Sequence, residues 1–236
     1  MQFGRSGAHV SQLDAVFFTH LHIDHTADFP ALIKSSYFEE RQRPLPVYGP
    51  VGNTVFPATT EYVADLFDPK RGAYRYLGDF VAGADDGYKL DAHNVVVGEH
   101  DVRKIYESPD LTASATRVVH GGVPAVAWRI QLGGKSVVFS GDTNGKNGNL
   151  QILAKDVDIF VAHNAIPEGE TDSGLLGLHM PPSIIGQIAR DAHVKSLVLS
   201  HRMLRSLGHE AETRAVIQKF YQGPIAFADD LDCFTP

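Results

Sequence analysis

The chain has 236 residues, of which 43% are hydrophobic and 21% charged, and its formal net charge is −7. These proportions are typical of a globular protein with a sizeable core. The acidic balance argues against a general nucleic-acid binder, because neutralisation of phosphates by Lys and Arg dominates such binding. A single cysteine, Cys233, excludes an intrachain disulfide.

No apolar run approaches the ~20 residues of a membrane span. The first residues, MQFGRSGAHVSQLD, lack the apolar core of a signal peptide. We therefore expect no membrane partner and a cytoplasmic location for the chain as given. A periplasmic or secreted location is the alternative if a further segment precedes it.

The first half of the chain alternates apolar runs with turn-forming residues. The apolar run at 15–18 predicts a buried strand that ends in a loop. A helix is predicted at 27–39, a strand at 45–50, and a helix in the second half of 52–67. Residues 68–92, rich in Gly, Asp and Tyr, are the least regular part. They fit a surface insertion and an active-site cover equally well.

The second half shows clearer strand and helix patterns. Strands are predicted at 113–120, 125–132, 136–142, 159–164, 195–201 and 223–230, and helices at 149–158, 183–192 and 210–220. Mixed strands and helices of this kind indicate a layered α/β protein. We expect a single domain that spans residues 1–236.

The densest chemistry lies in the stretch THLHIDH at residues 19–25, which contains His20, His22, Asp24 and His25. In an extended chain His20 and His22 point to the same side, whereas Asp24 and His25 fall in the turn that enters the next helix. Imidazole and carboxylate are ligands that zinc and similar metals accept. The stretch therefore predicts metal binding, and a polar turn with an Asp helix cap is the weaker alternative.

Three further strand-like runs end in side chains that can bind metal: His120, Asp142 and His201. Each of them alone would more often be an ordinary polar group at a strand end. Strand ends are rigid points from which side chains can be directed to a common position. Their shared position at strand ends makes all three candidate ligands.

The sequence resembles the metallo-β-lactamase superfamily, whose motif H-x-H-x-D-H matches residues 20–25. The segments PLPVYGP, FSGDT, LHMPPSIIGQIA and VKSLVLSH resemble the branch that holds ribonuclease Z and its arylsulfatase and phosphodiesterase relatives. The resemblance covers the chain from about residue 14 to its end. It implies an αββα four-layer sandwich, here lacking the usual N-terminal strands, because only 19 residues precede His20.

The resemblance also implies a dinuclear site that hydrolyses its substrate with a hydroxide shared by two divalent metal ions. Zinc is expected, with manganese or iron as alternatives. One ion would be held by His20, His22 and His120, the other by Asp24, His25 and His201, and Asp142 would bridge the two.

Two catalytic residues are expected from the resemblance. His179 lies where the ribonuclease Z branch places a proton donor for the leaving group, with a capping or surface histidine as the alternative. Asp24 is expected to act in catalysis as well as in metal binding. His163, where the branch tends to have glutamate, and Arg202, next to His201, are expected to contact substrate or support the site. The alternatives are a plain polar strand end and a solvated arginine.

The sequence contains no arm rich in Gly, Pro, Lys and Arg of the kind that binds tRNA in ribonuclease Z. Together with the net charge, this favours a small anionic ester of the aryl sulfate or phosphodiester class as substrate, with nucleic acid disfavoured. The alternatives are a tRNA 3′-end processing endonuclease and a non-catalytic metal-binding structural or interaction protein. An incomplete first sheet would expose strand edges, so we expect a homodimer or a larger homo-oligomer.

Overall fold

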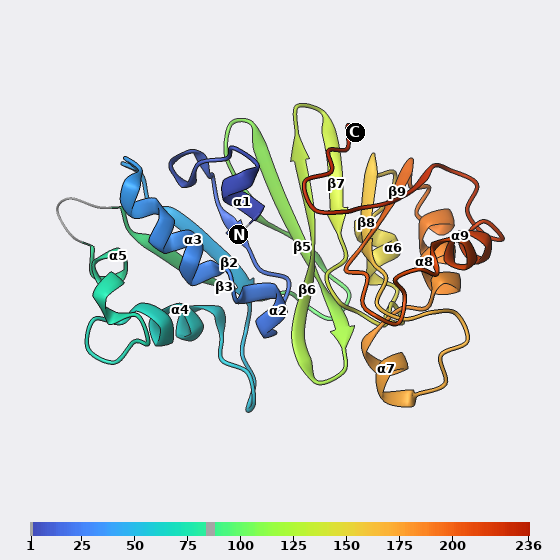
Figure 1. Cartoon of the computed structure of the whole chain (residues 1–236), viewed down its shortest axis with the longest axis horizontal. Helices are drawn as coiled ribbons and strands as arrows, with labels where there is room; N and C mark the ends of the chain where they lie inside the picture. Colours follow the sequence, from blue (N-terminus) through green and yellow to red (C-terminus); the bar gives the residue numbers. More distant parts are fainter. Residues whose placement is uncertain (1, 84–87) are drawn as a thin grey trace. The chain divides into compact units, whose positions relative to one another are not determined.

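The computed structural model describes residues 2–83 and 88–236. The chain divides into two compact units, Met1–Val96 and Val97–Pro236, called here the N-terminal and the C-terminal unit. Each unit contains one β-sheet with helices packed on it (Figure 1). Among the described residues, no helix combines the length and the apolar character needed to cross a membrane.

The sheet of the N-terminal unit is parallel and has the order β1-β2-β3. Its strands are β1 (Val16–Phe17), β2 (Leu45–Pro50) and β3 (Leu90–Val95). The first two were predicted. The third was not, because Asp, His and Asn interrupt its apolar pattern.

Two helices of this unit, α3 (Phe29–Ser35) and α4 (Thr59–Phe67), pack on the sheet (Figure 1). Phe29, Ile33, Val63 and Phe67 share one buried apolar cluster with residues of β2 and β3. Both helices were predicted, although α3 is shorter than the expected range. The remaining short helices of the unit are α1 (Gln2–Arg5), η1 (Val10–Gln12), α2 (Ile23–Thr26), η2 (Ser36–Phe38), η3 (Arg75–Leu77) and α5 (Asp79–Ala82).

The irregular segment 68–92 is described only in part. Its first part contains η3 and α5, residues 84–87 lie outside the described residues, and residues 90–92 belong to β3. Its function as an active-site cover stays a prediction, as does the single domain over residues 1–236.

The C-terminal unit contains a mixed seven-stranded sheet of order β10-β9-β8-β7-β6-β5-β4. Its strands are β4 (Val102–Glu107), β5 (Leu111–His120), β6 (Val123–Leu132), β7 (Lys135–Phe139), β8 (Ile159–His163), β9 (Ser196–Ser200) and β10 (Ile225–Phe227). All except β4 were predicted. Gly133 and Gly134 form the predicted hairpin turn between β6 and β7, and both have positive φ angles, which glycine adopts without steric cost.

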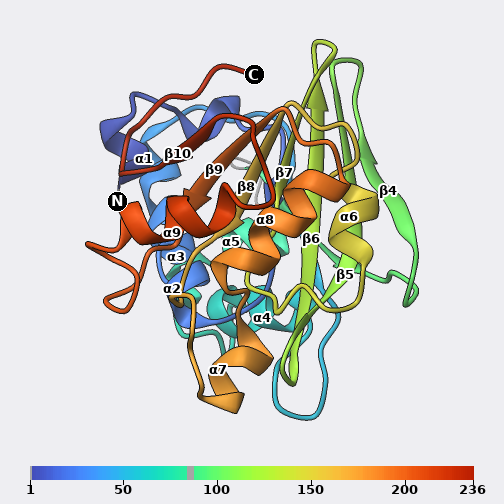
Figure 2. The same cartoon turned by 90° about the vertical axis from the view of Figure 1, so that its right-hand side faces the viewer.

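Three predicted helices, α6 (Asn149–Leu153), α8 (Pro182–Asp191) and α9 (Glu210–Ile217), contribute to the core of this unit. Figure 2 shows α8 and α9 beside the strands β8 and β9. The short helix α7 (Ser173–Leu178) was not predicted. Its sequence SGLLGL contains two glycines, which weaken the helical signal.

The strand directions explain why distant residues meet at one edge of this sheet. β7, β8 and β9 are parallel, and β5 runs the same way because two antiparallel pairings separate it from β7. The carboxyl ends of these four strands therefore lie at the same edge. The predicted ligands His120, Asp142 and His201, together with His163, are found there, at or just after the strand ends.

Candidate metal centre

The polar cluster of the C-terminal unit is arranged around Asp142, which is 3% exposed. Its Oδ2 atom lies 3.9 Å from His120 Nε2, 3.8 Å from His179 Nδ1 and 3.6 Å from His201 Nε2. His120 and His179 are also buried. Predicted residues from four different segments of the chain are thus brought together.

These distances fit a divalent cation between the side chains. They exceed the range of N–H···O hydrogen bonds and resemble the ~3.4 Å between two ligand atoms of tetrahedral zinc with bonds of ~2.1 Å. The ligand atoms of His120, Asp142 and His179 all lie within 4.8 Å of one another. Because burial of a carboxylate is costly without a compensating charge, this donor set suits a metal ion.

The protonation of His120 is set by its backbone partner. Its Nδ1 lies 2.9 Å from the carbonyl oxygen of Leu178, and a carbonyl can only accept, so Nδ1 carries the proton. In the neutral ring, Nε2 then presents a lone pair on the side of Asp142. This contact between β5 and the end of α7 orients a predicted ligand, and the sequence did not reveal it.

A second orienting residue that the sequence analysis missed is Asn144. Its Nδ2 donates to the carbonyl of Gly177 over 3.0 Å, and its backbone N–H donates to Val119. The loop after Asp142 is thereby tied to β5 and to α7. The only signal in the sequence was the Asn that follows Gly-Asp-Thr.

His201 has a left-handed backbone conformation, with a φ angle of 51°. Non-glycine residues rarely adopt this conformation, and they cluster at functional sites when they do. The turn after β9 therefore carries local strain at a predicted ligand, whose imidazole faces Asp142.

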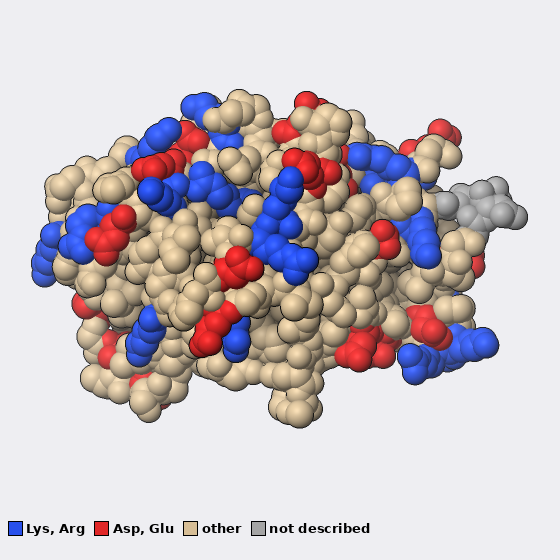
Figure 3. Space-filling view, turned by 180° about the vertical axis from the view of Figure 1, so that it is seen from behind, with Lys and Arg blue, Asp and Glu red and all other residues tan. Residues whose placement is uncertain are grey.

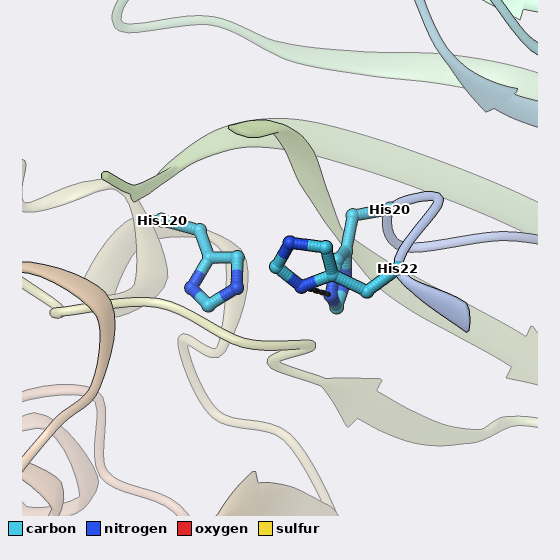
Figure 4. Close-up of side chains that lie close together, drawn as sticks. All are labelled: His20, His22 and His120. Carbon is cyan, nitrogen blue, oxygen red and sulfur yellow. Dashed lines mark hydrogen bonds between the residues drawn. The ribbon is translucent and has the colours of Figure 1, made fainter. Parts of the chain in front are cut away.

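The N-terminal unit brings the four residues of its predicted motif together. His20 Nε2 lies 3.2 Å from His22 Nδ1, the contact drawn in Figure 4. The rings of His20 and His25 are 4.0 Å apart at their centroids, and His25 Nε2 lies 3.6 Å from a carboxylate oxygen of Asp24. Asp24 and His25 belong to α2, which begins directly after His22.

His163 is a fully buried residue of the C-terminal cluster. Desolvation lowers its pKa to about 3, against the opposing effect of Asp142, so it is neutral at physiological pH. Its Nε2 accepts the backbone N–H of Met180 over 3.4 Å, which leaves the proton on Nδ1, 3.5 Å from Ser140 Oγ. His163 thus contacts the backbone next to His179 and is not a solvated strand end. Its contact with substrate stays a prediction.

The guanidinium of Arg202 forms hydrogen bonds with other residues of the C-terminal unit. It donates to Glu210 over 2.7 Å, to the carbonyl of Ala228 over 3.1 Å, and to Asp229. These two carboxylates lie 8 and 27 positions after Arg202 in the chain, so the sequence did not reveal the pairing. The contacts favour a structural role, and the predicted contact with a substrate anion remains a prediction.

The sequence matches the family described as "Beta-lactamase superfamily domain" over residues 2–202. The chain belongs to this superfamily. Ribonuclease Z of Bacillus licheniformis is 26% identical to this superfamily member, in an alignment that covers 84% of the chain and 72% of the relative. Ribonuclease Z of Limosilactobacillus reuteri is 27% identical, with 85% and 73% covered. Ribonuclease BN of Cronobacter sakazakii is 25% identical, with 89% and 78% covered.

Two solved structures share the fold of this superfamily member. The metallo-beta-lactamase fold protein YhfI from Bacillus subtilis has a TM-score of 0.68 at 20% identity, with 94% of this chain and 77% of that chain covered. Human tRNase Z, short form, has a TM-score of 0.67 at 18% identity, with 98% and 82% covered. The predicted fold class and the prediction of a metal-dependent hydrolase are confirmed.

Proposed function

We propose that this hydrolase cleaves phosphodiester bonds in RNA, in the manner of a tRNA 3′-end endonuclease, and that it uses two divalent ions. The observation that carries the proposal is that the relatives reported above are named ribonucleases and cover 84–89% of the chain. This support favours the alternative from the sequence analysis over the small anionic ester that was first expected. The family match also includes all seven candidate ligands, since it spans residues 2–202.

We assign the ligands as the superfamily motif implies. His20, His22 and His120 would hold one ion, Asp24, His25 and His201 would hold the other, and Asp142 would be shared. Two such ions, zinc in the first place, would supply Lewis-acid chemistry and lower the pKa of a bound water towards ~7. The orientation of His120 supports its part in this assignment, because the carbonyl of Leu178 holds its ring in one tautomer.

His179 is proposed to donate a proton to the leaving oxygen. It lies directly after α7, its Nδ1 is 3.8 Å from Asp142, and the backbone N–H of the next residue is held by His163. A general acid must lie within hydrogen-bond reach of the atom that it protonates, and these contacts fix the backbone beside His179. Because His179 also belongs to a group that could hold a metal, its effect on metal content has to be measured together with the rate.

The direct test is cleavage of a precursor tRNA by the zinc-loaded and the manganese-loaded protein. We expect a cut at the 3′ end of the mature tRNA sequence, and its loss in Asp142→Ala. The protein should contain close to two metal ions per chain by elemental analysis. A metal-loaded, folded protein that leaves the RNA intact would contradict the proposal.

Hydrolysis of a small phosphodiester or aryl sulfate is the second candidate. It is favoured by the net charge of −7 and by the mixing of Lys and Arg with Asp and Glu on the face drawn in Figure 3. The two candidates differ in their dependence on salt. RNA cleavage should weaken strongly between 50 and 200 mM salt, roughly tenfold or more, because cations are displaced from RNA on binding. Turnover of bis(nitrophenyl) phosphate or nitrophenyl sulfate should change little.

A homodimer or a larger homo-oligomer is part of the same proposal. It rests on the expectation that the strand edges of the β1-β2-β3 sheet, as described, are covered by another chain. Light scattering coupled to size-exclusion chromatography measures the mass directly. A mass of one chain over the whole concentration range used in the activity assay would contradict it.

A further inference from the structure

The N-terminal unit contains a cavity that none of the predicted ligands lines. Its volume is about 470 Å³, within the range of small-molecule sites. The walls come from η2, the loop that follows it, α5 and Tyr88. They combine aromatic rings with carboxylates: Tyr37, Phe38, Phe80 and Tyr88 with Glu39, Glu40 and Asp79.

The ring of Phe80 contacts the rings of both Tyr37 and Tyr88, and the ring planes are inclined to each other. Phe80 makes an edge contact with Tyr37 at 5.3 Å and 84°, and a tilted contact with Tyr88 at 4.8 Å and 47°. Tyr88 is held by a 2.8 Å hydrogen bond with Ser36 Oγ. Phe80 and Tyr88 are buried and belong to the apolar cluster of this unit, so packing supports two walls of the cavity.

The rings of this cavity already bind cations of the chain itself. The ammonium of Lys34 lies 4.2 Å from the ring centroid of Tyr37 and 5.4 Å from that of Phe38. The guanidinium of Arg41 lies 5.4 Å from the centroid of Tyr88. Ring faces carry the negative part of the aromatic quadrupole, and they attract ammonium and guanidinium groups at these distances.

The charge of the cavity walls also favours a cation. Three carboxylates line the cavity, against the guanidinium of Arg41 and the neighbouring ammonium of Lys34, so negative charge remains in excess by one. Arg41 is fixed by its hydrogen bonds to backbone carbonyls, among them those of Val10 and Leu13. Burial opposes ionisation of Glu39, but hydrogen bonds from Ser11 keep its pKa below the usual value, so this wall is anionic at neutral pH.

We propose that this aromatic cavity binds a small molecule through an organic ammonium group. Aromatic faces and carboxylates together recognise such a group, because the rings contact its methyl or methylene surface while the carboxylates balance its charge. A phosphate or another anion would be repelled by the same walls. The site would take its ligand independently of the metal cluster, and the proposal does not depend on the reaction that the chain catalyses.

The test compares three probes on the metal-loaded, full-length protein. Choline carries a quaternary ammonium, dimethylbutanol is its neutral isostere, and butylammonium presents the primary amine of a lysine-like ligand. We expect choline to bind in the millimolar range, with dimethylbutanol at least about tenfold weaker because it lacks the charge. Isothermal titration calorimetry gives the affinity, and aromatic proton shifts in NMR locate the probe. Tighter binding of butylammonium would support a primary amine as the natural ligand head group.

Variants of exposed residues separate this site from weak surface binding. Tyr37→Ala and Asp79→Asn should each weaken choline binding by roughly 3- to 30-fold, whereas Tyr37→Phe keeps the ring and should restore it. Phe234→Ala and Asp110→Asn, exposed residues outside the cavity, serve as matched controls. Circular dichroism checks that each variant is folded. Equal affinity for choline and dimethylbutanol would overturn the proposal, and so would an affinity that neither Tyr37→Ala nor Asp79→Asn changes.

Discussion

Asp142 and Asp158 are both buried carboxylates next to strands of the C-terminal unit, but their surroundings differ. Asp158, just before β8, accepts hydrogen bonds from the backbone N–H and the hydroxyl of Ser136 at 2.8 and 3.0 Å. It also accepts one from the ammonium of Lys195 at 2.9 Å. Asp142, after β7, has imidazole nitrogens at 3.6–3.9 Å.

The two sets of contacts suit different roles: a structural role for Asp158 and a metal-binding role for Asp142. The carboxylate of Asp158 is bound directly by protein donors, which stabilise its charge in the folded state. The imidazoles around Asp142 stand further off, at a spacing that suits a metal ion between the side chains. The five residues of β7 correspond to roughly 16 Å of strand, so one end of the sheet can be changed with little effect on the other.

The largest effect is expected from Asp142→Asn. The variant keeps the size of the side chain but removes the charge that a shared metal ligand needs. The hydrolytic rate should fall about 10³-fold or more, because several kcal/mol of metal-dependent stabilisation are lost, and metal content should decrease. Rate measurement together with elemental analysis checks both. An unchanged metal content at a normal rate would show that Asp142 is not a ligand.

The next effect is expected from His179→Ala. A lost general acid should slow esters with basic leaving groups by about 10²–10⁴-fold, while esters with acidic leaving groups such as nitrophenolate should slow much less. The measurement is a plot of log kcat against leaving-group pKa for both proteins. Parallel lines would remove the acid role, and loss of metal in the variant would make His179 a ligand.

Asp158→Asn should instead affect stability. We expect the free energy of unfolding to fall by about 1–2 kcal/mol, a modest value because solvent screens the exposed ammonium of Lys195. Rate and metal content should stay as in the parent protein. Urea unfolding followed by circular dichroism gives the change, and a variant that loses activity but keeps its stability would reverse the comparison of the two aspartates.

The same residue predicts a pH dependence. The hydrogen bond from Lys195 and those from Ser136 lower the pKa of Asp158 to about 2, below about 3.9 in an unfolded chain. Its stabilising effect is therefore complete above pH ~4 and is lost as the pH falls towards 2. The stability difference between the parent and Asp158→Asn should shrink over this window. A difference that stays constant down to pH 2 would contradict the assigned cause.

The smallest effect is expected from Asp172→Ala. Asp172 caps α7 by accepting the backbone N–H groups of Gly174 and Leu175, and loss of such a cap costs about 1 kcal/mol. The carbonyl of Leu178, at the end of this helix, orients His120, so the rate should fall slightly as well. Asp172→Asn keeps a capping oxygen and should behave like the parent in thermal unfolding. An equal loss in both variants would exclude the cap as the cause.

The sequence by itself determined the ligand candidates, the layered α/β class and the superfamily. Residues 19–25 place three imidazoles and a carboxylate within seven positions, and His120 ends a strand that is recognisable from its apolar residues. Such signals are local, because the repeat of side chains along a strand or helix is written in neighbouring positions. For the same reason β3, β4 and α7 were missed, since polar residues or glycines interrupt their patterns.

The tertiary structure decided which polar residue serves which purpose. Arg202 pairs with two carboxylates, His163 is buried beside His179, and Asp158 is bound by Lys195. Each partner lies many positions away or on another strand, and the packing of the folded chain brings the two residues together. Burial then sets the energetic consequence, because a polar group removed from water must find a partner within reach in the folded chain.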